Sequence, residues 1–185
     1  MNTGQMMLTI CAMFLLSMTI LTVSRGTLST NSTMVDSRYD ILAVAVATSI
    51  IEDATGLAFD NNTASAAITS LNSLTAVASL GKETGEAASN PAGFNDFDDY
   101  NVYKDTTNAK KDTITVQGQT GKRIIFKTVC KVDYVSANNP SATSASRTWH
   151  KRLRLFVYNP EIRDPITRKT DTVKISTVFS YWYFR

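Results

Sequence analysis

The first stretch of the chain is apolar on every side. From Met1 to Ser24 no side chain carries a charge, and the first charged residue is Arg25. Serine and threonine are the only polar residues within 6–23, and their hydroxyl groups can hydrogen-bond to the backbone of their own helix at little cost. At 1.5 Å per residue this block is roughly 27 Å long, close to the roughly 30 Å of a bilayer core. The pattern predicts a long apolar helix.

A second, amphipathic helix is predicted over residues 34–56. Apolar residues recur there three and four positions apart, and the charged residues gather toward the two ends. Gly56 is a natural stop for this helix. Between the two helices lie Gly26 and the run TLSTNST (27–33), which is poor helix-forming material. We therefore expect a flexible joint there, so that residues 1–33 form a separate anchor or core segment.

The remainder of the chain, residues 34–185, is expected to form one globular head. Residues 57–111 predict mainly loops, with Pro91 and several glycines as breakers. From residue 112 onward apolar and polar residues alternate, which predicts an antiparallel sheet with one covered face. Strands are predicted at 113–117, 126–134, 149–158 and 171–184, with turns at 138–146 and 159–165. The predicted fold class is α+β, with the helix packed on an antiparallel sheet of about four strands.

Composition and charge change this picture little. The 185 residues carry a formal net charge of +3, which is too weak alone to imply a nucleic-acid partner. Of the two cysteines, Cys11 lies in the apolar block and Cys130 in a predicted strand, so the chain has no disulfide framework. Cys130 is interpreted as a small buried hydrophobic residue.

The apolar block is expected to be retained and not removed as a secretory signal. Its start, MNTG, contains no Lys or Arg, and TVSRG lacks the small residues of a typical cleavage site. A single-pass membrane anchor is the simplest interpretation. However, Arg25 and Arg38 follow the block, and the positive-inside rule would then place the head in the cytoplasm.

An uncharged N-terminal helix, an amphipathic continuation and a C-terminal antiparallel sheet together resemble the type IV pilins and pseudopilins. The resemblance rests on MNTGQMMLTICAMFLLSMTILTV and on the loop motif FNDFDDYN (94–101). It implies a leader that ends at a glycine, here Gly4, and a filament core formed by the freed helix. The sequence departs from the family pattern in two ways. The basic leader is absent, and Gln5 or Thr9 stands where the family has a glutamate at the fifth position. The implied core residues are Met7, Ile10, Phe14, Leu15 and Ile20.

The resemblance implies a structural subunit of an extracellular, cell-surface helical filament. Its partners would be copies of itself, the inner membrane that holds the precursor before assembly, and pilus or secretion assembly machinery. Two alternatives stay open: a minor pseudopilin of a type II secretion-like machine, and a membrane-anchored module that binds DNA or polysaccharide. We expect no enzyme, because no catalytic constellation, phosphate loop or zinc spacing occurs in the sequence.

Two clusters are candidate sites. Asp96, Asp98 and Asp99 lie among aromatic residues and either bind Ca²⁺ or bond to local backbone groups in an Asx-rich turn. Ca²⁺ is the one cofactor that the sequence suggests. The second cluster is a surface basic patch that includes His150, Arg152 and Arg154. It is a solvated strand face, a surface for DNA or an acidic partner, or a contact with the acidic loops of a neighbouring subunit.

Overall fold

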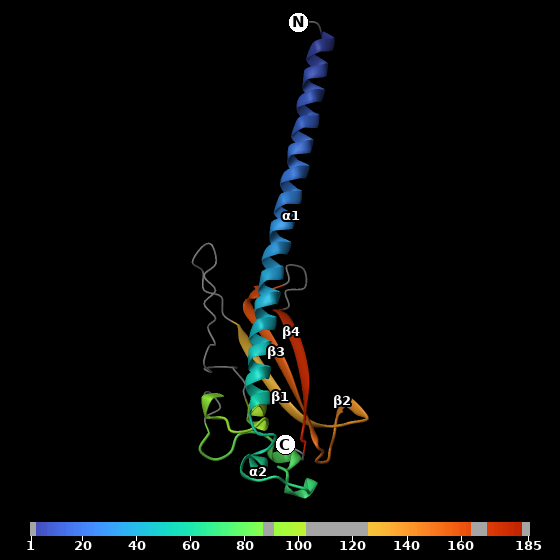
Figure 1. Cartoon of the computed structure of the whole chain (residues 1–185). Helices are drawn as coiled ribbons and strands as arrows, with labels where there is room; N and C mark the ends of the chain where they lie inside the picture. The colour runs from blue at the N-terminus through green and yellow to red at the C-terminus, as the bar shows by residue number, and fades with distance from the viewer. Residues whose placement is uncertain (1–2, 87–90, 103–125, 164–169, 183–185) are drawn as a thin grey trace. The chain divides into compact units, whose positions relative to one another are not determined.

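The computed structural model describes residues 3–86, 91–102, 126–163 and 170–182 (Figure 1). The chain divides into two compact units, Met1–Leu42 and Ala43–Arg185, each of which is described by itself. The mixed α+β fold class is confirmed. The helices are α1 (Thr3–Gly56), α2 (Asn61–Ser65) and the short 3-10 helices η1 (Leu71–Ser73), η2 (Val77–Ser79), η3 (Pro91–Gly93) and η4 (Asp98–Val102). The strands are β1 (Lys127–Ser136), β2 (Asn139–Thr143), β3 (His150–Arg163) and β4 (Thr170–Ser180).

Helix α1 continues through 27–33, where the sequence predicted a flexible joint. The physical reason is cooperativity, because extending an existing helix is far less costly than starting a new one. Hydroxyl groups in this stretch donate to backbone carbonyls three or four residues earlier, which satisfies these donors inside the helix without favouring it. The two compact units meet within this helix, between Leu42 and Ala43. The hydroxyl donors are Thr27, Thr30, Ser32 and Thr33.

In the second unit, the last turns of α1 bury one face. The buried positions are three and four residues apart, as an amphipathic helix requires. This stretch lies across the sheet formed by β1, β3 and β4 (Figure 1), whose facing side chains are also buried. Helix and sheet therefore form two layers around one apolar core. The buried helix residues are Ala43, Val46, Ala47, Ile50 and Ala54.

The four described strands form an antiparallel sheet in the order β2-β1-β3-β4. Cys130 pairs with Leu155 and Val132 pairs with Leu153, so the apolar residues of β1 and β3 share one face. Leu155 in turn pairs with Ile175 on β4. The predicted alternation in β1 and β3 is confirmed, because Cys130, Val132, Leu153 and Leu155 are all buried. Cys130 is thus a buried residue, and burial raises the pKa of its thiol to about 12.

Three sequence predictions in the sheet region have different outcomes. The expected turn at 138–146 contains strand β2, which extends the edge of the sheet beside β1. The expected turn at 159–165 is partly strand, since β3 runs to Arg163. The predicted strand at 113–117 lies outside the described residues.

A smaller aromatic cluster joins the loops after α1 to the sheet. Phe59 and Tyr134 are buried there, and Phe179 of β4 packs against the cluster. The ring of Phe179 lies 5.8 Å from Phe59 and 5.1 Å from Phe97, measured between ring centroids. Phe97 belongs to the predicted Asp-rich loop, so this cluster fixes that loop against the sheet.

Candidate functional site

The apolar segment of α1, residues 6–23, is the largest exposed hydrophobic feature among the described residues. Its Met, Leu, Ile, Val and Phe side chains are each between 50% and 72% exposed. The helix is long and apolar enough to cross a membrane, by length and composition. Gly4 lies in its first turn, with open space around it. All five predicted core residues are exposed here: Met7, Ile10, Phe14, Leu15 and Ile20.

The Asp-rich loop is folded by its own carboxylates. Oδ1 of Asp96 accepts hydrogen bonds from the backbone N–H groups of Asp98 (2.8 Å) and Asp99 (3.2 Å), which caps η4. Oδ2 of Asp99 accepts from the N–H groups of Asn95 (2.9 Å) and Asp96 (3.1 Å). The loop therefore contains the local backbone bonding that an Asx-rich turn predicts.

The third aspartate of this loop, Asp98, pairs with a buried lysine. Asp98 Oδ1 and Asp60 Oδ2 both accept hydrogen bonds from Lys151 Nζ, the latter at 2.9 Å. The carbonyl oxygen of Phe59 accepts a third bond at 2.7 Å. The ammonium group also lies 4.7 Å from the centroid of the Phe59 ring. All three charged side chains are fully buried, so this ion-pair cluster ties β3 to two loops and is closed to solvent.

Asp60 is the centre of a second set of hydrogen bonds. It accepts from the N–H of Thr75 at 2.9 Å, from its hydroxyl at 3.1 Å, and from the N–H of Asn62 at 3.2 Å. Burial raises the pKa of Asp60, but the charge of Lys151 and the hydrogen bonds together lower this pKa by more than burial raises it. The net pKa lies below the ordinary value, so Asp60 is ionised and serves as the counter-ion of Lys151.

Lys151 lies between the predicted patch residues His150 and Arg152, and its burial shows that this part of β3 is not simply a solvated strand face. Leu153, Leu155 and Val157 lie on the buried, apolar face of β3, and alternation places residue 151 on the same face. The sequence therefore contained the signal for a buried lysine. A lysine at an inward position of a strand requires carboxylate partners, and Asp60 and Asp98 supply them.

The predicted surface basic patch is also only partly exposed. Arg152 is buried, and its Nη1 donates to the carbonyl oxygens of Pro140 (2.9 Å) and Ser141 (2.6 Å) in β2. Arg152 and Arg154 both form ion pairs with Asp133. His150 is half-buried, and its Nδ1 lies 2.7 Å from Ser180 Oγ. Because Arg152 is buried and both arginines pair with Asp133, Arg152 does not belong to an exposed basic patch. Within the described residues, the Nε atoms of Arg152 and Arg154 are buried without a hydrogen-bond partner.

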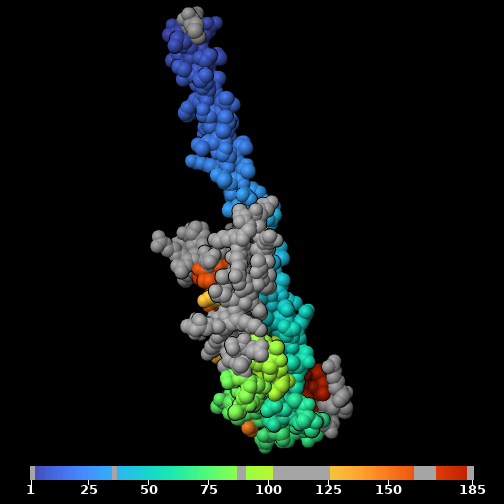
Figure 2. Space-filling model, turned by 90° about the vertical axis from the view of Figure 1, so that its left-hand side faces the viewer, coloured from blue at the N-terminus to red at the C-terminus, as the bar shows by residue number. Residues whose placement is uncertain are grey.

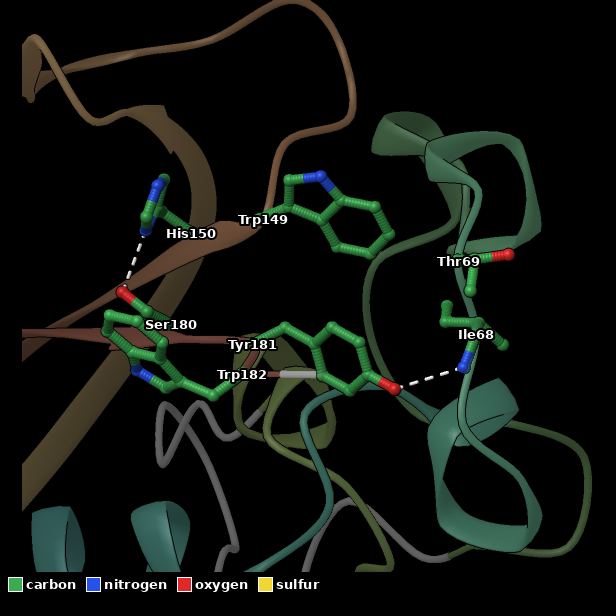
Figure 3. Close-up of a pocket in the computed structure, with 7 residues that line it drawn as sticks. All are labelled: Ile68, Thr69, Trp149, His150, Ser180, Tyr181 and Trp182. Carbon is green, nitrogen blue, oxygen red and sulfur yellow. Dashed lines mark hydrogen bonds between the residues drawn. The ribbon is translucent and has the colours of Figure 1, made fainter. Parts of the chain in front are cut away.

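An aromatic pocket of about 490 Å³ lies between the ends of β3 and β4 and the loop after α2 (Figure 3). The rings of Trp149 and Tyr181 are stacked at a centroid distance of 5.4 Å. The Tyr181 hydroxyl accepts a hydrogen bond from the N–H of Ile68 at 3.0 Å, which holds the loop against the sheet. The indole of Trp182 is 75% exposed. The lining residues are Ile68, Thr69, Trp149, His150, Ser180, Tyr181 and Trp182.

Asp99 lies in an acidic cluster that the sequence analysis missed. Glu83, Glu86 and Asp99 each place one carboxylate oxygen within 4.8 Å of the others. Glu83 and Glu86 come from the loop after η2, and only the tertiary fold brings them to Asp99. The structure thus gives Asp96, Asp98 and Asp99 three different environments.

No family model matches this chain, and no curated protein or solved structure matches it. Its function is therefore inferred from the residues themselves.

Proposed function

We propose that this protein is a structural subunit of a pilus-like, extracellular helical filament, with a membrane-anchored precursor. One observation carries the proposal. The described helix contains an uncharged segment, residues 6–23, whose large apolar side chains are all at least half exposed. Such a surface does not stay in water, because each buried Leu, Ile or Phe side chain gains about 1.5–3 kcal/mol over an exposed one.

The segment has two apolar environments available, lipid and other copies of the same segment. Apolar helices exchange one for the other with little change in solvation and are then held by close packing. Ala12, Ser17 and Thr19 are small, so they permit close approach of neighbouring helices. The hydroxyls of Ser17 and Thr19 donate to the carbonyls of Met13 and Leu16, which leaves few unsatisfied polar groups at such an interface.

The proposal is tested on the full chain in the cells that produce it. Material sheared from the cell surface is examined by electron microscopy with an antibody against the head. We expect labelled filaments from the wild type and from Phe14→Leu, and none from Phe14→Arg, because an arginine is costly in an apolar interior. The amount of Phe14→Leu and Phe14→Arg protein in the membrane fraction is also measured. Labelled filaments from Phe14→Arg, or wild-type protein found only as membrane-bound monomers, would contradict the proposal.

Abundance separates the filament subunit from a minor pseudopilin of a secretion machine. A major subunit makes up most of the sheared filament mass. A pseudopilin is present in few copies, so the antibody would not label a filament along its length.

The aromatic pocket favours a second candidate function, a membrane-anchored module that binds polysaccharide. Its volume falls within the range of small-ligand pockets, and the exposed ring of Trp182 offers a face on which a sugar ring stacks. Binding of polysaccharide fragments to the detergent-solubilised full chain tests this function. Trp182→Ala should abolish binding, whereas Leu71→Ala, at an exposed position outside the pocket, should not.

A further inference from the structure

Two segments of the head bring three carboxylates together. The loop 80–86 and the segment 91–102 lie side by side at the surface of the head (green to yellow-green in Figure 2). The side chain of Asn101 joins them by donating to the carbonyl of Leu80 at 2.8 Å. Gly85 has a φ of +108°, a conformation that favours glycine, and its turn lies between Glu83 and Glu86. The carboxylates of Glu83, Glu86 and Asp99 thereby converge within 4.8 Å.

Hydrogen bonds position these groups but do not satisfy them. Glu86 accepts from the N–H of Glu83 at 2.8 Å and from Asn95 Nδ2 at 2.9 Å. Asp99 is fully buried, and only its Oδ2 accepts hydrogen bonds. In the part of the chain that the structure describes, Asp99 Oδ1 and Glu83 Oε2 are shielded from solvent and have no hydrogen-bond partner. Buried carboxylate oxygens without a partner are costly, and native proteins seldom leave them so.

No lysine or arginine of the described residues neutralises the three carboxylates. The ammonium group of Lys151 pairs with Asp60 and Asp98. The neighbouring Lys82 donates to the backbone carbonyl of Glu86 and not to a carboxylate. As a result, burial and then the charges of Asp99 and Glu86 raise the pKa of Glu83 to about 7.

We propose that Glu83, Glu86 and Asp99 form a Ca²⁺ site. The donors are all carboxylate oxygens, the ligand type that hard cations prefer. Ca–O bonds are about 2.3–2.6 Å long, so oxygens within 4.8 Å of one another fit around one ion. Mg²⁺ requires near-ideal octahedral geometry at about 2.0–2.1 Å, which a site with one loop-borne pair of glutamates matches less well. Glu83 and Glu86 are half-buried, which leaves room for water to complete the coordination.

This site differs from the one that the sequence predicted. Of the predicted ligands it retains only Asp99. Asp98 is the partner of Lys151, and Asp96 Oδ1 is used to cap η4. The bound ion would join the loop 80–86 to η4 and so brace the loops that pack against the end of the sheet. The proposal does not depend on the filament function, because all of its residues lie in the head.

The test measures Ca²⁺ binding to the full chain in detergent after treatment with a chelator. Isothermal titration should show one Ca²⁺ per chain and weaker binding of Mg²⁺. Glu83→Gln is the decisive variant, because the Glu83 carboxylate accepts none of the hydrogen bonds described above. It should weaken Ca²⁺ binding about tenfold or more, since affinity follows the number of charged ligands. Glu52→Gln, at an exposed position of α1, should bind as the wild type does.

Thermal unfolding gives a second measurement that a purely structural role would not reproduce. In chelator, Glu83→Gln should unfold at a higher temperature than the wild type, because it removes a repelled charge. In Ca²⁺ at about 100 times the Kd the wild type should gain about 5 °C or more, and the order of the two proteins should reverse. Absence of Ca²⁺ binding to the wild type, equal binding of Mg²⁺, or unchanged Ca²⁺ affinity in Glu83→Gln would overturn the proposal.

Discussion

Lys151 Nζ lies 2.9 Å from Asp60 Oδ2, and neither side chain is exposed to solvent. The lysine is on the apolar face of β3, whereas the aspartate follows α1 by four residues. This pair, with Asp98, is the polar junction between the sheet and the loops that carry the Asp-rich motif.

Replacing Lys151 by methionine should destabilise the head strongly. Methionine fills a similar volume, but it leaves Asp60 and Asp98 buried without a counter-ion, which costs about 3–5 kcal/mol. Denaturant unfolding of the full chain in detergent measures the change. Lys174→Met, at an exposed position of β4, is the matched control and should stay within about 0.5 kcal/mol of the wild type. Equal effects of the two substitutions would show that the buried pair does not hold the loops.

The same pair predicts how stability depends on pH in acid. The pKa of Asp60 is lower in the folded protein than its ordinary value of 3.8. The stabilisation from its ionised form is therefore fully present above pH 3.8 and is lost as the pH falls through the folded-state pKa. Denaturant unfolding between pH 5 and pH 2 measures this loss. Asp60→Asn should remove that component of the acid dependence, and an unchanged slope in this variant would contradict the assignment.

Much of the fold could be predicted from the pattern of the sequence because alternation and helical spacing are local properties. The faces of β1 and β3 follow directly from the period of two, and so does the burial of Lys151. Strand β2 lies in a run rich in Asn, Ser and Pro, and its residues are exposed, so no alternation marked it. The continuous helix through 27–33 was missed because propensity alone takes no account of cooperativity, which favours the extension of an existing helix.

The candidate sites were harder to predict because their partners are distant in sequence. Asp99 is 16 and 13 positions from Glu83 and Glu86, and nothing in the intervening loops marks the contact. Likewise, the sequence predicted an exposed Arg152, whereas in the structure β2 supplies two carbonyl acceptors to its guanidinium group. Sequence identified the Asp-rich loop, but only the tertiary structure assigned each carboxylate its partner.

The two cysteines provide a test of burial and assembly. Burial raises the pKa of Cys130 to about 12, so its thiol should not react with a maleimide in the folded protein. Cys11 is exposed in the apolar segment and should react in detergent-solubilised protein. In assembled material Cys11 should become protected, because neighbouring segments cover it. Mass spectrometry of each labelled peptide distinguishes the two thiols. Rapid labelling of Cys11 in filaments would contradict the packing of neighbouring apolar segments around this residue.

The central claim is that residues 6–23 pack against copies of themselves in a helical array, and cysteine cross-linking tests it most directly. Two differently tagged chains, both with Cys11→Ser, are expressed together. Each chain carries one introduced cysteine, at position 7, 10, 14, 15 or 20, and both equal and unequal pairs of positions are compared. Neighbours in a helical array are related by a rotation and a rise, so contacts form between different positions. We predict that surface material shows strong cross-links between unequal positions such as 7 and 14. Cross-links only between identical positions, as in a two-fold membrane dimer, or no cross-links at all, would contradict the account.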